Sequence, residues 1–73
     1  MIESLLLVEG KNVDVESLRS RSLRNAKQLV FGRFGAGHVV HLGLNSLEDL
    51  PGALSDLSKV AGVSAITTLA IRK

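Results

Sequence analysis

The two histidines are the residues best suited to metal or acid–base chemistry in this chain. His38 and His41 lie in a stretch rich in β-branched and aliphatic residues, which favours a strand. Residues three apart on a strand project to opposite faces, so one chain cannot bring both imidazoles to one metal ion. Zinc needs three or four ligands, and the chain has no cysteine. We therefore expect no metal site and one histidine on each face of a sheet.

The nucleophiles and carboxylates also lack the partners that catalysis needs. No serine lies in a G-x-S-x-G elbow or has an evident base and orienting acid. Capping explains Asp14 and Asp49, and the other carboxylates flank a strand or lie on solvated helix faces. The glycines of residues 32–37 precede a strand, whereas a phosphate-binding loop places them before a helix. We expect a protein that is not an enzyme and carries no cofactor.

The apolar pattern predicts six elements in the order β-α-β-β-α-β. Gly10 and Glu9 end the first strand, Asp14 caps the first helix, and Gly35-Ala36-Gly37 forms a hairpin with glycine at positive φ. The predicted strands are residues 2–8, 27–34, 38–44 and 63–71, and the predicted helices run from Asp14 to about Arg24 and from Ser46 to about Ala61.

The second helix carries the strongest local signals. Ser46 and Asp49 fit the [ST]-x-x-[DE] capping pattern, and Gly62 can end the helix in a left-handed conformation. Pro51 lacks a donor within the first turns, which leaves a second start open, at Asp49 after a 3₁₀ turn at Ser46. The predicted buried stripe consists of Leu47, Leu50, Leu54, Leu57 and Ala61.

This element order predicts a single ferredoxin-like α+β domain over residues 1–73. Right-handed crossovers place both helices on one face of a four-stranded antiparallel sheet. The opposite face is predicted to be apolar, because the first, third and fourth strands carry aliphatic residues at both alternating sets of positions. A chain of 73 residues without disulfides has a marginal core. We therefore expect a homodimer formed through the sheet, with a higher oligomer left open.

Charge and hydropathy argue against several classes of function. The net charge of +2 is too weak to indicate nucleic acid, and the cluster Arg19, Arg21, Arg24 and Lys27 is better explained by the dipole of a helix end than by phosphate contacts. RNA recognition on the sheet is also disfavoured, because Phe31 and Phe34 lie on the second strand. The longest apolar run, Leu5 to Val8, is too short to span a bilayer. At the N-terminus no basic segment precedes a hydrophobic one, so we expect no signal peptide. We expect a cytoplasmic location.

Three short motifs in the second half carry a family resemblance. Asn45 to Leu50 precedes a helix, Val60-Ala61-Gly62-Val63 follows it, and Thr67-Thr68-Leu69 lies in the last strand. With these motifs the chain resembles the ligand-sensing (RAM) domain of the Lrp/AsnC family of transcription regulators, in which a proline is favoured at the position of Ala61. Chain length and element order agree with the resemblance.

The resemblance implies a stand-alone sensing domain. Almost no residues precede the first strand, so the helix-turn-helix of full-length members is missing and direct DNA binding is not expected. In the family, a G-x-Y-D-like turn helps to build an effector pocket between dimers. Gly35-Ala36-Gly37-His38 occupies that turn here without the aromatic residue or the acid. The implied ligand site lies at a subunit boundary near Gly35, Gly37, His38, Thr67 and Thr68.

Three hypotheses for function follow. The first is a non-catalytic, oligomerising module that senses a small molecule, with a free amino acid as the first effector to test. The second is a structural adaptor whose open sheet pairs with a larger regulator or enzyme, including full-length regulators of the same family. The third is weak RNA or DNA binding through the segment from Arg19 to Lys27.

Overall fold

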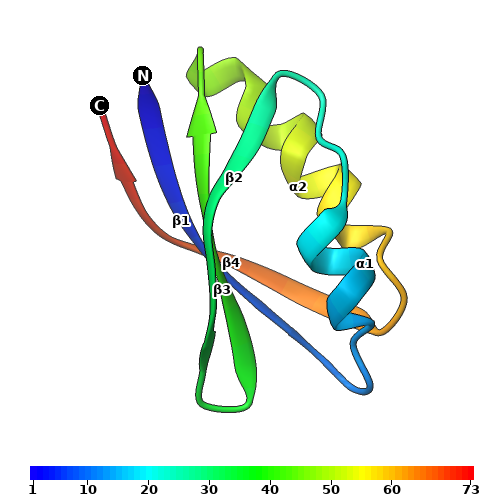
Figure 1. Cartoon of the computed structure of the whole chain (residues 1–73). Helices are drawn as coiled ribbons and strands as arrows, with labels where there is room; N and C mark the ends of the chain where they lie inside the picture. The colour runs from blue at the N-terminus through cyan, green and yellow to red at the C-terminus, as the bar shows by residue number, and fades with distance from the viewer.

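The structure, a computed structural model, describes all residues from 1 to 73 and contains four strands and two α-helices. The strand order in the sheet is β2-β3-β1-β4, and all neighbouring pairs are antiparallel. Both helices lie on one side of the sheet (Figure 1). The predicted ferredoxin-like α+β fold is therefore confirmed. The elements are β1 (Ile2–Gly10), α1 (Val15–Ser20), β2 (Ala26–Phe34), β3 (Gly37–Leu44), a 3₁₀ turn η1 (Leu47–Asp49), α2 (Leu50–Ser58) and β4 (Val63–Arg72).

The hydrophobic core lies between the helices and the two central strands. Alternate residues of β1 and β3 face the helices, because side chains along a strand alternate between its faces. Helix α2 supplies three buried residues, whereas α1 supplies only Leu18. No helix is long and apolar enough to cross a membrane. The buried hydrophobic residues are Leu6, Val8, Leu18, Val40, Leu42, Leu44, Leu50, Ala53, Leu57 and Val60.

Helix α1 begins as predicted but ends four residues early. The Asp14 carboxylate accepts hydrogen bonds from the Ser17 backbone N–H at 3.1 Å and the Ser17 hydroxyl at 2.9 Å. The helix ends at Ser20, and Arg21 is already extended. Serines compete for backbone hydrogen bonds and favour helix ends, so the segment of residues 20–22 does not continue the helix. The prediction of a helix to about Arg24 was wrong.

The start of α2 follows the alternative that Pro51 had suggested. The Ser46 hydroxyl accepts a hydrogen bond from the Glu48 N–H at 3.3 Å, a 3₁₀ turn follows, and the α-helix begins at Leu50 with Pro51 in its first turn. Asp49 makes no side-chain cap. The tighter 3₁₀ turn places Leu47 off the buried stripe, and its exposed fraction is 42%.

The end of α2 also differs from the prediction. The helix stops at Ser58 rather than at about Ala61. Ala61, which was predicted to be buried, is exposed, and the neighbouring Val60 is buried in the core. Gly62 has a φ of +89°, as expected for a residue that reverses the chain. A Cβ atom at Gly62 would lie 2.5 Å from the Asn12 carbonyl oxygen. Only glycine therefore fits this close approach between the loops that precede α1 and β4.

Candidate functional site: the open face of the sheet

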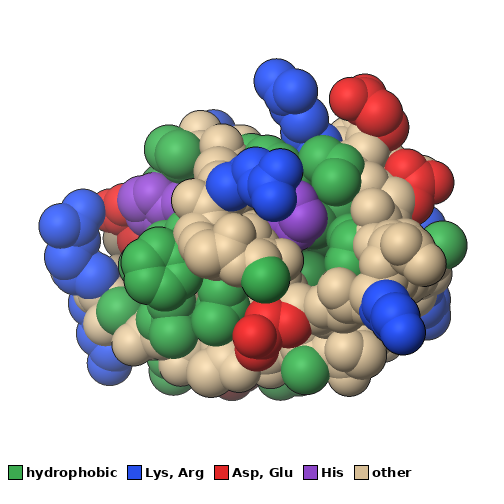
Figure 2. Space-filling view, turned by 90° about the horizontal axis from the view of Figure 1, so that it is seen from below, with side chains coloured by type: hydrophobic (Ala, Val, Ile, Leu, Met, Phe, Trp, Pro, Cys, Tyr) green, Lys and Arg blue, Asp and Glu red, His purple; other side chains and the backbone are tan.

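The face of the sheet opposite the helices, here called the open face, is largely apolar. Leu7 and Val39 pair across the two central strands, and both are half-buried. Toward the β2 edge the exposure rises, to 59% for Val30 and 66% for Phe34. Figure 2 views the molecule from the end with the β2–β3 turn and shows hydrophobic side chains gathered on the side away from the helices. The apolar open face expected from the sequence is present.

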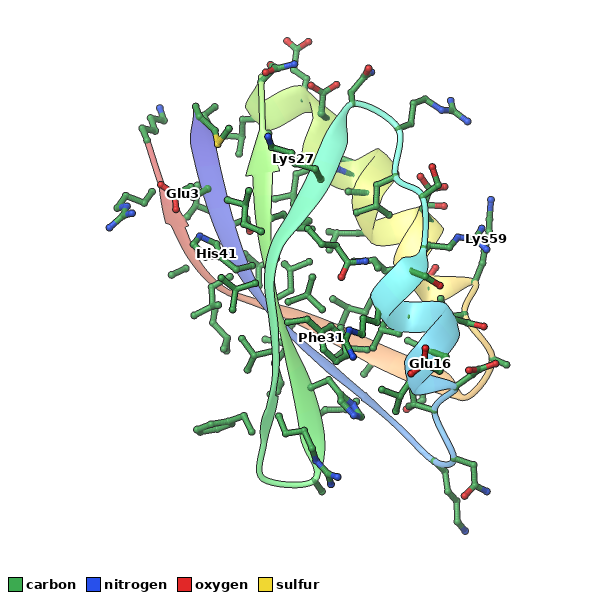
Figure 3. The ribbon with its side chains drawn as sticks, in the orientation of Figure 1. Glu3, Glu16, Lys27, Phe31, His41 and Lys59 are labelled. Carbon is green, nitrogen blue, oxygen red and sulfur yellow. The ribbon has the colours of Figure 1, made fainter.

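A β-bulge determines which residues of β2 reach this face. Gln28 pairs with Leu42, but Val30 pairs with His41, so Leu29 is the extra residue. Both Leu29 and Val30 therefore lie on the open face. Beyond the bulge the alternation is reversed, and Phe31 turns to the helix side (Figure 3). The bulge thus adds an apolar residue to the open face and removes an aromatic ring from it.

A three-residue charge cluster interrupts the apolar surface. Glu3 on β1 lies between His41 on β3 and Arg72 on β4, and Figure 3 shows Glu3 and His41 on the side of the sheet away from the helices. The His41 Nε2 atom is 2.7 Å from Glu3 Oε1, and the Arg72 Nη2 atom is 3.0 Å from Glu3 Oε2. Both carboxylate oxygens of Glu3 therefore have a cationic or imidazole partner.

The cluster keeps Glu3 ionised. The hydrogen bond from Arg72 is the main cause that lowers the pKa of the Glu3 carboxyl, and the charges of Arg72 and His41 add to it, while partial burial acts in the opposite direction. The three side chains border a shallow hollow of ≈290 Å³ together with Leu5 and Ala70. A carboxylate beside a guanidinium can meet the ammonium and carboxylate groups of a zwitterionic ligand, or fix the register of a second protein surface.

Sequence reasoning did not identify this cluster. Glu3 was expected to flank a strand and His41 to lie on one face of the sheet, and Arg72 lies just beyond the predicted end of the last strand. The three residues are far apart in the chain. They meet only because β1 pairs with both β3 and β4 in one particular register. That register is a property of the folded sheet.

The structure distributes the predicted ligand-site residues over both faces. Gly35 lies in the β2–β3 turn with a φ of +60°, which confirms the predicted hairpin. Thr67 pairs with Leu7 and so lies on the open face, whereas Thr68 pairs with Leu6 on the helix side. A Cβ atom at Gly37 would lie 3.1 Å from a methyl group of Leu7, which places Gly37 on the open face.

His38 points away from the open face. Its side chain is on the helix side, is 7% exposed and stacks on Phe31 with the ring centroids 5.7 Å apart. The buried Nδ1 atom of His38 has no hydrogen-bond partner. The two histidines therefore lie on opposite faces, as predicted. One chain brings Gly37 and Thr67 to either side of Leu7, but it does not bring the five predicted residues into one pocket.

The basic segment and the two phenylalanines lie on different parts of the molecule. Arg19, Arg21 and Lys27 border a hollow of ≈330 Å³ at the α1–β2 connection, away from the centre of the open face. Phe31 and Phe34 lie on opposite faces of β2 because of their register with β3. Bases stack on aromatic rings that share one surface, so these two rings cannot act together.

No protein-family model, no curated protein and no solved structure matches this chain. The resemblance to the Lrp/AsnC sensing domain therefore stays a prediction from the sequence. The ferredoxin-like fold is shared by proteins of many unrelated functions. We therefore infer the function from the surface of this molecule, and above all from its apolar open face.

Proposed function

We propose that this protein is a non-catalytic regulatory module that works as an assembly of copies joined through their open faces. The observation that carries the proposal is the apolar surface centred on Leu7 and Val39 and flanked by Leu29, Val30 and Phe34. Contiguous apolar patches of this kind on soluble proteins commonly mark protein interfaces. A second copy offers the same surface, as a two-fold contact requires.

The small core adds a thermodynamic reason for association. Ten hydrophobic residues form the core, and the molecule has an accessible surface of 4552 Å². A stable interface buries about 800 Å² on each partner, and removal of apolar surface from water contributes roughly 25 cal/mol per Å². Burial of the open face therefore adds hydrophobic stabilisation to a small core.

The Glu3 cluster is compatible with burial in such an interface. An isolated ion is costly to remove from water, but the Glu3 carboxylate already has partners on both oxygens. Charged groups at fixed positions also penalise contacts in the wrong register. In this proposal the cluster sets the orientation of the two copies, while the aliphatic residues provide most of the stabilisation.

The sensing part of the proposal rests on the same surface. Gly37 and Thr67 flank Leu7, and Glu3 and Arg72 provide a carboxylate and a guanidinium on that face. A free amino acid has complementary charges, which agrees with the ligand class implied by the resemblance to Lrp/AsnC domains. A ligand bound between copies stabilises the assembly that contains the complete pocket and shifts the population toward it.

The association is tested by a matched pair of lysine substitutions. Val30→Lys places a charge on the open face, and Leu47→Lys places the same charge on η1, where Leu47 is 42% exposed. We expect light scattering to give a lower mass for Val30→Lys than for the wild-type chain and no change for Leu47→Lys. A wild-type protein with the mass of one chain, 7.8 kDa, would refute the proposal.

A thermal-shift titration with the twenty amino acids tests the sensing part. An effector that binds the assembly raises the melting temperature in a concentration-dependent manner. Glu3→Gln should remove that shift if the carboxylate meets the ligand ammonium group. An adaptor that pairs with a larger regulator through the same face would show no shift with any amino acid and would still lose its partner on Val30→Lys substitution.

A further inference from the structure

The two edges of the sheet are protected to different degrees. The β2 edge carries Lys27 and Arg33, and charged residues on an edge strand oppose pairing with other chains. The β4 edge has no charged residue and no proline from Val63 to Ile71. Bulges interrupt its pairing with β1 near both ends, but Ala65–Thr68 pair regularly between them. An extended strand can therefore add to β4 more readily than to β2.

A hollow beside β4 offers room for the side chains of an added strand. It has a volume of ≈560 Å³ and lies between α2 and the first half of β4. No charged residue borders it. In strand addition, main-chain hydrogen bonds to the edge provide affinity, and alternate side chains of the added strand enter adjoining pockets. The bordering residues are Leu54, Ser55, Ser58, Val63, Ser64, Ala65 and Ile66.

We propose that β4 pairs in antiparallel orientation with β4 of a second copy, so that two four-stranded sheets become one continuous sheet. The composition of β4 favours its own copy as the occupant. In an antiparallel two-fold contact centred on Ala65–Thr68, the uncharged residues from Val63 to Ala70 face one another, and the two Arg72 side chains lie at opposite ends of the paired stretch. Exposed Leu69 and Ile71, at 49% and 45%, also lose contact with water there.

The edge contact is independent of the contact through the open face. Pairing along β4 extends the sheet sideways, and the open face of each copy stays available. The two contacts together close into an assembly of four chains when their two-fold axes intersect at right angles, and this size rests on the proposed function. Either contact alone produces a dimer. The mass of single and double variants therefore shows separately whether each contact exists.

Three variants test the edge contact by sedimentation velocity. Thr68→Lys adds a cation to the exposed β4 edge, and Ala36→Lys adds the same charge to the β2–β3 turn as a control. We expect Thr68→Lys to halve the wild-type mass and Ala36→Lys to leave it unchanged. The double variant Thr68→Lys with Val30→Lys should sediment as one 7.8 kDa chain. Unchanged mass in Thr68→Lys would overturn the edge contact, even if Val30→Lys still lowers the mass.

Hydrogen exchange gives a second measurement that does not depend on any variant folding. In an antiparallel edge strand, alternate amides point away from the neighbouring strand and exchange rapidly unless another strand pairs with them. We expect the outward amides of Ala65–Thr68 in the wild-type protein to exchange at least about tenfold more slowly than exposed amides of the β2–β3 turn. Exchange of all outward β4 amides at the rate of the turn would overturn the proposal.

Discussion

Glu3 is the residue whose charge state most affects the open face. Its pKa is lowered in the folded protein, chiefly by the hydrogen bond from Arg72. The unfolded chain, with the ordinary pKa, binds more protons at mildly acidic pH, so the free energy of unfolding rises with pH in that range. The stabilisation from Glu3 is complete above the ordinary pKa of 4.5 and is lost as the pH falls through the lowered value.

Substitution of Glu3 tests this linkage. We expect the free energy of unfolding of Glu3→Gln, measured by urea denaturation, to change less between about pH 3 and pH 6 than that of the wild type. Glu9→Gln is the matched control, because Glu9 lies on the same strand and face, is exposed and has no ion pair. Equal acid dependence in the two variants would show that the contacts of Glu3 with Arg72 and His41 do not persist in solution.

Gly62 and Gly35 provide a second residue-level comparison. Both have positive φ, but a Cβ atom at Gly35 would meet no atom within 4 Å, whereas one at Gly62 would meet the Asn12 carbonyl oxygen. We expect Gly35→Ala to cost about 1–2 kcal/mol through backbone strain alone. Gly62→Ala should cost clearly more in the same urea experiment. A smaller loss for Gly62→Ala would mean that the loops before α1 and β4 are not closely packed.

At the level of elements, α2 provides most of the helical contribution to the core. Leu57 is fully buried, and Leu47 is 42% exposed although both had been predicted on one stripe. We expect Leu57→Ala to lower the free energy of unfolding by roughly 2–5 kcal/mol. Leu47→Ala should lower it by less than about 1 kcal/mol. Similar losses for the two variants in chemical denaturation would support the regular helix from Ser46 in place of the 3₁₀ turn.

Gly52 offers a stabilising substitution in the same helix. It is exposed within α2, and a Cβ atom there would have open space around it. Glycine in a helix is less stable than alanine by roughly 0.5–1 kcal/mol. Gly52→Ala should therefore raise the thermal midpoint of unfolding. A lower midpoint would indicate that the segment after Pro51 is not helical.

The elements that could be predicted are those whose signals are local. Capping by Asp14 and Ser46, the Gly35 turn and the positive φ of Gly62 depend on a few neighbouring residues, and all four are present in the structure. The helix itself ends before Gly62, at Ser58. The bulge at Leu29 depends on pairing with β3, and strand propensity does not reveal it. The end of α1 was missed because Ser20 and Ser22 alternate with arginines, and this segment has only a weak helical signal.

The candidate site was less predictable than the fold for the same reason. The apolar open face was predicted because the first, third and fourth strands carry aliphatic residues at both alternating sets of positions. The orientation of His38, in contrast, depends on the register of β3, and the meeting of Glu3, His41 and Arg72 requires three strands to align. A pocket that contains residues from two copies also depends on their arrangement in an assembly. Sequence patterns within one chain do not specify how the strands align or how two copies are arranged.

At the level of the whole molecule, the proposed contact through the open face adds buried apolar surface to a small core. The helices cover one face of the sheet, and the apolar residues of the other face are available for contact with another copy (Figures 1 and 2). In the proposed function, regulation depends on the equilibrium between separate and associated chains, which a ligand or a partner can shift only through different affinities for the two states.

Sedimentation equilibrium of the wild-type chain over a range of micromolar concentrations shows whether copies associate through the open face. We expect a mass of at least two chains of 7.8 kDa, which falls on dilution or on substitution of Val30 by lysine. A folded protein that sediments as a single chain at every concentration would contradict it, because the open face would then be stable in contact with water.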